Sequence, residues 1–263
     1  MARTERRPLA LVTGASSGIG FELAKQFAEH GFDLVVCSAG ERIEQAAAEL
    51  RAMGAEVTPA RVDLSSSAGV EDLVAAVEGM GRPLDAAAIN AGVGAGGAFV
   101  ETDLQDHLDL ISLNVTGLVH LTWRLLPAML ARGEGRLLFT SSIAAEMPAP
   151  YQATYGASKA FVQSFAIAIR NEVKDSGVTV TSLMPGPTDT EFFERADMEE
   201  SRAAQGKKDD PAKVAKDGYE ALMAGKDHVV AGSAVNKVMS TASDLIPEKA
   251  SAAVHGRMNL PKE

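Results

Sequence analysis

The feature that most constrains this chain is a glycine-rich turn near the N-terminus, Gly14-Ala15-Ser16-Ser17-Gly18-Ile19-Gly20. An apolar run over residues 9–13 leads into the turn, and Ile19, Leu23 and Phe27 then recur at helical spacing. Glycine allows positive φ and close backbone approach, and the unpaired amides at a helix N-terminus attract phosphate. The strand, turn and helix therefore predict a cradle for a pyrophosphate group; a glycine-rich turn that only packs tightly is the alternative.

Apolar strand-like runs alternate with helical patterns along most of the chain. The predicted strands cover residues 8–13, 32–37, 56–61, 84–89, 135–141, 177–183 and 227–231. The predicted helices cover residues 18–30, 40–53, 67–79, 103–132 and 152–175. Such alternation indicates right-handed βαβ crossovers and a mainly parallel sheet with helices on both faces. We expect a three-layer α/β/α fold of the Rossmann type, doubly wound and seven-stranded, with ligands beyond the carboxyl ends of the strands.

Length and composition fit one domain over residues 1–263. Hydrophobic residues make up 46% and charged residues 23%, which is typical of a soluble globular protein. The formal net charge of −10 argues against a nucleic-acid partner, because phosphate binding usually requires a basic face. We expect no membrane partner, because no apolar run spans a bilayer and Gly14 interrupts the first apolar stretch before signal-peptide length.

The cysteine and histidine content bears on disulfide bonds, location and metal binding. The single cysteine, Cys37, excludes an internal disulfide and favours a reducing, cytoplasmic location. Because it lies in an apolar run, a small strand residue is the simplest interpretation. The five histidines are scattered without metal-ligand spacing, so we expect no catalytic metal.

Two polar side chains on one predicted helix, Tyr155 and Lys159, point to proton transfer, with Ser142 upstream of them. Residues four apart on a helix lie on the same face, so the ammonium is placed beside the phenol. Tyrosine titrates near pH ~10 in water, and a desolvated positive neighbour is one way to lower its pKa. For the pair alone, a half-buried tyrosine beside a lysine that extends to solvent is the alternative.

A second glycine-rich stretch, residues 92–97, matches the Gly-x-Gly-x-x-Gly pattern of many dinucleotide-binding turns literally. The first turn has a different spacing, Gly-x-x-x-Gly-x-Gly. However, no helical pattern begins after residue 97 until about Asp103. We therefore interpret residues 92–97 as a loop at the mouth of the site rather than a second phosphate cradle.

Several short motifs together resemble those of the short-chain dehydrogenase/reductase family. They are Thr13-Gly14-Ala15-Ser16-Ser17-Gly18-Ile19-Gly20, Asn90-Ala91-Gly92, Asn114, Ser142, Tyr155, Lys159 and Pro185-Gly186. They occur in the family's order and cover essentially the whole chain. The resemblance implies an NAD(P)-dependent oxidoreductase that transfers hydride between the cofactor and a carbonyl or secondary alcohol of a small molecule.

The resemblance also implies a role for each member of a catalytic tetrad. Tyr155 would be the general acid or base, and Lys159 would lower its pKa and bind the nicotinamide ribose. Ser142 would bind the substrate oxygen; Ser141 competes for this role, although alternation along a strand points it elsewhere. Asn114 would hold a water of the proton relay through its main chain, and a polar residue that satisfies a helix irregularity is the compatible alternative.

The remaining family motifs imply a cofactor site. Asn90 would stabilise the sheet near the adenosine, and Asp63 would contact the adenine with the Leu64 backbone nearby; Asp63 as a helix cap is the alternative. The Thr188 backbone and the Thr190 hydroxyl would hold the carboxamide and phosphates. The full set expected to bind cofactor is Gly14, Ser16, Ser17, Gly18, Ile19, Gly20, Ser38, Arg42, Asp63, Leu64, Asn90, Ala91, Gly92, Tyr155, Lys159, Pro185, Gly186, Thr188 and Thr190.

The chain departs from the family pattern where the cofactor is usually selected. Ser38 and Ala39 stand where an acidic residue for NAD or an arginine for NADP is typical. Ser38 and Arg42 could meet a 2′-phosphate, whereas Glu41 could accept from a ribose diol. The sequence therefore favours NADP slightly and leaves NAD open. Ile89, where the family often has a second asparagine, is expected to face the sheet interior.

The remaining expectations concern a lid, the oligomeric state and the alternative functions. A charged stretch over residues 187–217 is expected to be a substrate lid, with a solvated helical excursion as the alternative. Excess apolar surface on the helix predicted over 103–132 favours a homodimer or homotetramer. A catalytically silent NAD(P)-binding regulator is the alternative function, and dehydration or epimerisation on the same fold is a third.

Overall fold

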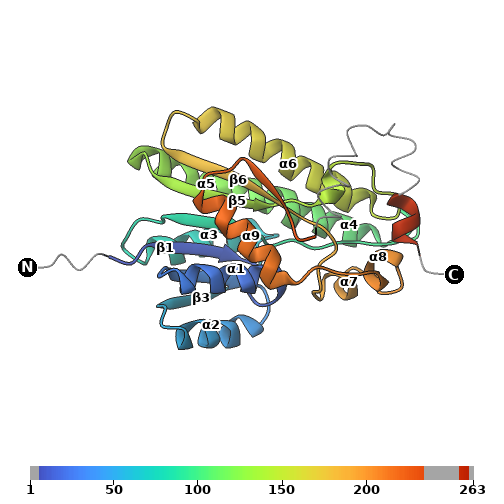
Figure 1. Ribbon diagram of the computed structural model, residues 1–263, viewed down its shortest axis with the longest axis horizontal. Helices are drawn as coiled ribbons and strands as arrows, with labels where there is room; N and C mark the ends of the chain where they lie inside the picture. Colours follow the sequence, from blue (N-terminus) through green and yellow to red (C-terminus); the bar gives the residue numbers. More distant parts are fainter. Residues whose placement is uncertain (1–5, 234–254, 261–263) are drawn as a thin grey trace, which may run out of the picture.

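Seven parallel strands form the central sheet of the protein, whose computed structural model describes residues 6–233 and 255–260 (Figure 1). The strands are β1 (Leu9–Thr13), β2 (Asp33–Ser38), β3 (Val57–Arg61), β4 (Ala86–Ile89), β5 (Gly135–Thr140), β6 (Val178–Pro185) and β7 (His228–Ala231). Their order across the sheet is β3-β2-β1-β4-β5-β6-β7. The doubly wound, seven-stranded fold expected from the sequence is confirmed, and each predicted strand agrees with the observed one to within two residues at either end.

The strand order reverses between β1 and β4, which pair directly with each other. Val12 lies opposite Ala88 in this pair, and Thr13 lies opposite Cys37 on the other side of β1. The chain leaves β1 toward one half of the sheet and leaves β4 toward the other half. The loops at the carboxyl ends of these two strands therefore diverge and open a crevice, which is where ligands bind in folds of this type.

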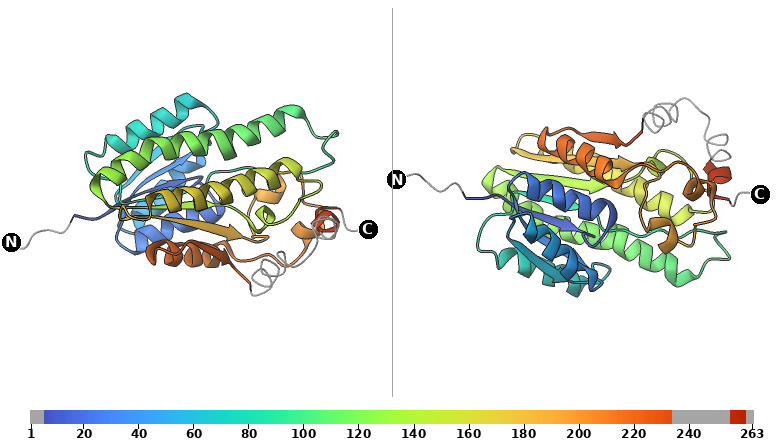
Figure 2. Two further views of the ribbon diagram at one scale, coloured as in Figure 1. Left: turned by 90° about the horizontal axis from the view of Figure 1, so that it is seen from above. Right: turned by 60° about the horizontal axis from the view of Figure 1, so that its bottom comes forward.

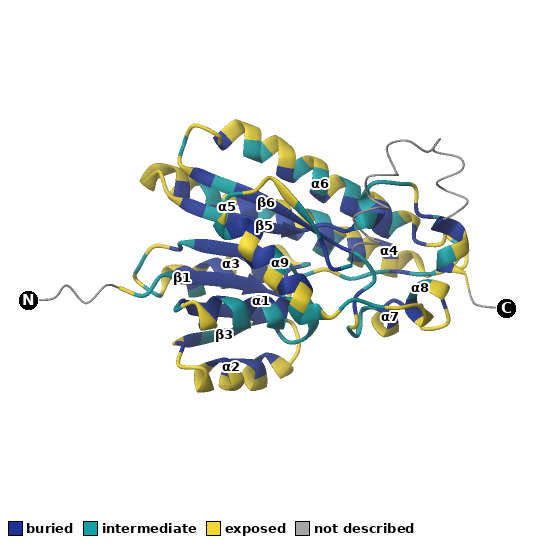
Figure 3. Cartoon of the chain, viewed as in Figure 1, coloured by how far each residue is buried: buried dark blue, intermediate teal, exposed yellow. Residues whose placement is uncertain are grey.

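Helices cover both faces of the sheet and complete three layers (Figures 1 and 2). One face carries α1 (Gly18–Glu29), α2 (Arg42–Ala52) and α9 (Pro211–Met223), and the other carries α3 (Ser67–Glu78), α5 (Leu118–Arg132) and α6 (Ala153–Val173). The strands are buried on both sides, and the helices bury only their inner faces (Figure 3). Within the described part of the chain, no helix is long and apolar enough to cross a membrane.

The helix predicted over residues 103–132 is present but contains a change of winding. It begins as α4 (Leu104–Ile111), continues as a π-helical turn over Ser112–Gly117 and ends as α5. The π-helical turn carries Asn114, whose side chain bonds to the backbone of Val93 in the loop after β4. Wider turns of this kind occur often at functional sites, and this one turns toward the crevice.

The helix α9 was missed by the sequence prediction, which assigned residues 211–217 to the charged stretch. Asp210 caps the helix by accepting a hydrogen bond from the Ala212 amide at 2.9 Å, and Pro211 occupies its first turn. Its apolar side packs against α1 and the sheet through Val214, Ala215, Tyr219 and Leu222. Residues 211–217 therefore belong to the core layer, and the charged residues between the apolar positions face outward.

An ion-paired carboxylate secures the amino end of the sheet, opposite the crevice. Asp33 is 2% exposed and meets Arg82 at 2.7 Å and Arg7 at 3.2 Å. It also accepts a hydrogen bond from the Glu56 amide at 3.1 Å. Buried carboxylates are stable only with such partners, so this cluster helps to fix β2 beside its neighbours.

Candidate active site

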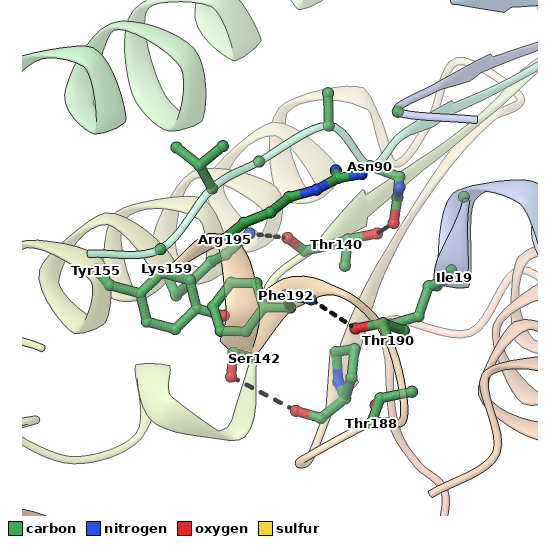
Figure 4. A pocket seen from close by; sticks show the side chains of 18 of the residues that line it. Ile19, Asn90, Thr140, Ser142, Tyr155, Lys159, Thr188, Thr190, Phe192 and Arg195 are labelled. Carbon is green, nitrogen blue, oxygen red and sulfur yellow. Dashed lines mark hydrogen bonds between the residues drawn. The ribbon is translucent and has the colours of Figure 1, made fainter. Parts of the chain in front are cut away.

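A cavity of about 340 Å³ lies at the carboxyl ends of the strands, at the crevice between β1 and β4. Its wall includes the glycine-rich turn after β1 and the ends of β2, β4, β5 and β6. Tyr155 and Lys159 enter it from α6, and Ser142 enters from the end of β5 (Figure 4). The structure thus brings the predicted phosphate cradle and the predicted proton-transfer residues into one cavity.

The glycine-rich turn has the close backbone packing that a phosphate cradle needs. A Cβ on Gly20 would lie 2.1 Å from the Gly14 carbonyl oxygen, so no other residue fits there. Ser17 is the N-cap of α1, and its side chain makes no cap bond to the helix. The Thr190 methyl group lies over Gly18 from the opposite wall. The first residues of α1 therefore line the cavity together with Ser17 and Thr190.

Asn90 joins three strands at the floor of the cavity. Its side chain donates to the Thr13 carbonyl at 3.2 Å and accepts from the Thr140 hydroxyl at 3.0 Å. The Thr13 hydroxyl accepts from the amides of Asn90 and Ala91, each at 2.9 Å. These bonds hold β1, β4 and β5 together where the cavity opens, which is the sheet-stabilising contact expected of Asn90. Ile89 before it is buried in the core, as expected.

The adenosine end expected from the sequence contains Ser38, Asp63 and Leu64, which all line the cavity. Ser38 donates a hydrogen bond to the Ser16 hydroxyl at 3.1 Å, which connects the end of β2 with the glycine-rich turn. Asp63 accepts from the Ser65 amide at 2.9 Å. The cap of α3 is instead Ser66, so the alternative reading of Asp63 as the helix cap is wrong.

Tyr155 and Lys159 are both buried, and burial controls their titration. Burial raises the pKa of the Tyr155 phenol to about 12, and a hydrogen bond with Ser142 acts in the opposite direction. Burial lowers the pKa of the Lys159 ammonium to about 8. The Lys159 ammonium donates to the Thr140 carbonyl at 2.9 Å and lies 5.7 Å from the centre of the Tyr155 ring.

The expectation that Lys159 lowers the pKa of Tyr155 stays a prediction, because burial determines the direction of the shift in the protein by itself. Desolvation of the phenol is the larger effect, and the ammonium is held by the Thr140 carbonyl rather than by the phenol oxygen. The face shared by residues four apart on the helix was predicted correctly. The sequence could not show how deeply both groups are buried.

The two serines at the end of β5 point in different directions. Ser141 donates to the Lys159 carbonyl at 2.9 Å and so contacts the backbone of α6. Ser142 lies beside Tyr155, and its hydroxyl accepts from the Ala144 amide at 3.1 Å and donates to the Pro185 carbonyl at 3.5 Å. The geometry therefore favours Ser142 for binding an oxygen held beside the phenol.

The side chain of Asn114 forms hydrogen bonds with neighbouring residues. Its main chain is part of the π-helical turn. Its amide group accepts from the Val93 amide and donates to the Val93 carbonyl, each at 2.9 Å, and donates to the Ser158 hydroxyl at 3.1 Å. Gly92 lies between Asn114 and Lys159, because a Cβ there would be 3.1 Å from the Asn114 side-chain oxygen and 3.3 Å from the lysine nitrogen. The three residues form a continuous wall behind the phenol.

The loop after β6 crosses the cavity opposite the glycine-rich turn. Pro185, Gly186, Thr188 and Thr190 all line the cavity. Thr188 donates to the Gly186 carbonyl at 2.8 Å, and the Thr190 hydroxyl accepts from the Phe192 amide at 3.3 Å. The cavity is lined no further along this segment than Ala203, so the portion of the expected lid from Pro211 onward lies away from it.

Arg42 and Glu41, the two residues expected to compete for the cofactor ribose, point to different partners. Glu41 pairs with Arg61 at 2.8 Å and is absent from the cavity wall. Arg42 is absent from the cavity wall as well, and it donates to the carboxylate of Glu191, which lines the cavity. Of the two residues, only Arg42 is thus bonded to a side chain of the cavity wall.

Further cavity residues belong to the segment over residues 187–217 that was expected to form a lid. Phe192 of α7 (Phe192–Arg195) packs against Tyr155 with ring centres 5.1 Å apart (Figure 4). Gly94 makes room for this ring, since a Cβ there would lie 2.6 Å from it. Glu191 and Arg195 line the cavity beside it. Cavity residues that the sequence analysis missed include Gln152, His255, Met258 and Asn259, for which no motif gave a signal.

The site contains no cluster typical of a metal centre. In residues 6–233 and 255–260, no group of three or more histidine, cysteine, aspartate or glutamate side chains could hold a metal ion. The donors that converge on the cavity include hydroxyls, backbone amides, the Lys159 ammonium and the Arg195 guanidinium group. Such donors suit phosphates and sugar hydroxyls.

A doubly wound sheet with a phosphate cradle at its switch point and a buried tyrosine, lysine and serine in the same cavity defines a nucleotide-dependent α/β enzyme. The sequence pattern of the short chain dehydrogenase family matches residues 8–201. The chain belongs to this family and is one of its oxidoreductases. The family resemblance seen in the sequence is thus confirmed.

Relatives in sequence and in structure support the same assignment. Oxidoreductase UcpA of Salmonella typhimurium is 34% identical over 206 residues, which cover 78% of this chain and 76% of that protein. A putative ketoacyl reductase of Streptomyces coelicolor is 37% identical over 190 residues, which cover 71% of this chain and 73% of that protein. A short-chain dehydrogenase from Sphingobium yanoikuyae, solved in complex with NADPH, is 29% identical with a TM-score of 0.77, and the match covers 85% of this chain and 87% of that one.

Proposed function

We propose that this oxidoreductase transfers hydride between NADP(H) and a carbonyl or secondary alcohol carbon of a small organic molecule, with Tyr155 as general acid or base. The observation that carries the proposal is the convergence of Tyr155, Ser142 and Lys159 on the cavity that also contains the glycine-rich turn. One relative by sequence is named a putative ketoacyl reductase, and one protein of the same fold was solved in complex with NADPH. These names support a carbonyl substrate and a nicotinamide cofactor.

The cavity fits a dinucleotide along its length. The amides of α1 and the hydroxyls of Ser17 and Thr190 would hold the pyrophosphate, and Ser38 with Asp63 would hold the adenosine end. Lys159 would donate to the nicotinamide ribose hydroxyls, since its ammonium is the cation beside Tyr155 in the cavity. The bound cofactor supplies the hydride and, in its oxidised form, a positive charge. The protein positions the cofactor and the substrate and supplies the proton.

The proton path starts at the phenol. In carbonyl reduction Tyr155 donates its proton to the substrate oxygen, and Ser142 donates a hydrogen bond to the same oxygen. A phenol with a pKa raised to about 12 is fully protonated at neutral pH and is ready to act as the acid. The ammonium of Lys159 stabilises the phenolate that results, because a buried positive charge favours a neighbouring anion. In the reverse direction the same groups accept the proton.

NADP is the cofactor we propose over NAD. Ser38 lines the cavity and Arg42 donates to Glu191 in the cavity wall, whereas the Glu41 carboxylate is paired with Arg61, which is not part of that wall. An arginine near the end of β2 suits a 2′-phosphate, and an acidic residue there suits a diol.

Three further parts of the proposal concern the lid, the oligomeric state and the location of the protein. We assign residues 187–210 as a lid, because Phe192 from this segment covers Tyr155. We assign a homodimer or homotetramer, because exposed apolar side chains gather on α4, α5 and α6: Leu104, Leu108, Ile111, Trp123, Phe161 and Ile167. A cytoplasmic location is supported by the single cysteine, Cys37, whose thiol has no disulfide partner in the chain.

The direct test is a fluorescence titration with NADPH and NADH, followed by a panel of ketones and aldehydes with the preferred cofactor. We expect tighter binding of NADPH and its oxidation by at least one carbonyl class. Tight NADPH binding without oxidation across the panel would instead support a catalytically silent regulator. Product formation without net cofactor oxidation would support dehydration or epimerisation.

A further inference from the structure

Three charged side chains form one network: Glu191 and Arg195 line the cavity, and Arg42 joins them from outside the cavity wall. Arg42 donates to both carboxylate oxygens of Glu191, with Nη1 to Oε1 at 2.6 Å and Nη2 to Oε2 at 2.5 Å. Arg195 donates to the same carboxylate from one turn further along the chain. Arg42 begins α2, whereas Glu191 and Arg195 belong to the segment after β6. The network therefore connects the end of β2 with the segment proposed as the lid.

The network lies at the end of the cavity expected to hold the adenosine ribose. Glu191, Arg195, Ser17 and Ser38 all line the cavity. The terminal nitrogen of Arg195 lies 3.5 Å from the Ser17 hydroxyl in the glycine-rich turn, and Figure 4 shows its side chain running across the cavity. In doubly wound folds the ribose 2′ position lies between this turn and the end of β2.

The arrangement matches what a phosphate group would need. An arginine presents the same planar fork to a carboxylate and to a phosphate, and two arginines around one anion suit a phosphate dianion with three oxygens. The two guanidinium groups hold the pKa of the Glu191 carboxyl at about 2, so it is an anion under all ordinary conditions. Glu191 thus places one negative charge where a 2′-phosphate would place its own.

We propose that Arg42 and Arg195 select NADP by binding its 2′-phosphate: in the free protein the Glu191 carboxylate holds both guanidinium groups in place, and the phosphate displaces it from them. NAD lacks this phosphate and leaves the carboxylate paired. Because Phe192 follows Glu191 and packs against Tyr155, the displacement also reaches the ring that covers the catalytic phenol. This inference rests on the proposed use of NADP, and it locates cofactor selection outside the usual position, Ala39.

The test uses two fragments that differ in the 2′-phosphate alone, 2′,5′-ADP and 5′-AMP, with affinities measured by titration calorimetry. For Glu191→Gln we expect the preference for 2′,5′-ADP over 5′-AMP to widen about fivefold, because the phosphate no longer competes with a carboxylate for the arginines. For Arg42→Ala we expect the preference to fall about tenfold or more, since a charge-assisted bond to the phosphate is lost. Arg195→Ala is expected to reduce it as well.

Glu199→Gln is the matched control, because it removes the same charge from an exposed position in the same segment. Its preference for 2′,5′-ADP should equal that of the wild type. An unchanged or narrower preference in Glu191→Gln overturns the inference, as does equal binding of the two fragments by the wild-type protein. Because neither fragment carries a nicotinamide, these outcomes are separate from the proposed activity: NADPH oxidation by a carbonyl substrate with an unchanged preference would retain the function and refute the role of Glu191.

Discussion

Burial of the Lys159 ammonium should cost the folded protein stability, so that replacing this residue is stabilising. Its pKa falls from the usual 10.5 to about 8 in the folded protein. By linkage, such a shift destabilises the folded state by about 3 kcal/mol at about pH 7. In Lys159→Met the charge is removed and the unbranched side chain is one heavy atom shorter. The hydrogen bond to the Thr140 carbonyl is also lost, at about 1 kcal/mol, so the expected net gain is about 2 kcal/mol.

The pH dependence separates this effect from repacking. A lysine whose folded pKa is depressed destabilises the folded state most where it is charged, and the penalty disappears as pH rises through the window from about 8 to 10.5. Between about pH 7 and about pH 9.5, the free energy of unfolding of the wild type should therefore rise by about 2 kcal/mol relative to that of Lys159→Met. This range lies below the usual pKa of tyrosine, so the raised pKa of Tyr155 does not contribute to the difference.

Urea denaturation of both proteins at several pH values, without added cofactor, measures the difference directly. Lys159→Arg is the control, since it retains a positive charge in the same place and should not be stabilised. The reasoning would be refuted if Lys159→Met were less stable than the wild type at neutral pH and if the two stability curves ran parallel up to about pH 9.5.

Three other predictions concern parts of the fold away from the catalytic groups. Asp33→Ala should lower the free energy of unfolding by about 3 kcal/mol, because Arg82 and the Glu56 amide lose a buried partner; a urea midpoint within error of the wild type would contradict this. Trp123→Glu should reduce the mass measured by light scattering, because this 70%-exposed side chain lies on the proposed subunit interface; a wild-type protein that is already monomeric would refute the interface. Burial raises the pKa of the Cys37 thiol to about 12, so Ellman's reagent should label it only after denaturation.

The order of strands and the location of the cavity could be predicted from the sequence because they depend on local patterns. The apolar runs and the glycine-rich turn can each be recognised from a few consecutive residues. The general rule for doubly wound sheets then predicts where the crevice lies. The helix α9 was missed because Lys213, Lys216 and Asp217 stand between its apolar positions and gave the stretch a polar appearance. Its capping Asp210 and Pro211 were the signal that could have found it.

The chemistry of the site was predictable in part. Tyr155, Lys159 and Ser142 follow from spacing along one helix and one strand, and the fold brings them together. The contacts of Phe192, Glu191 and Arg195 depend on how the segment after β6 packs against distant loops, and a sequence pattern contains no such distance. The direction in which the pKa of Tyr155 shifts depends on how deeply the phenol is buried. Only the three-dimensional structure shows that burial.

The central claim is that Tyr155 moves the proton, and Tyr155→Phe tests it most directly. The variant removes one hydroxyl from a side chain that packs against Phe192, so the ring contacts can remain. NADPH titration and carbonyl reduction should be measured on the same preparation, with Tyr151→Phe, a partly exposed tyrosine four residues earlier, as the matched control. We predict that Tyr155→Phe binds NADPH as the wild type does and loses turnover by about a thousandfold. Turnover within about tenfold of the wild type, with cofactor binding intact, would contradict the claim.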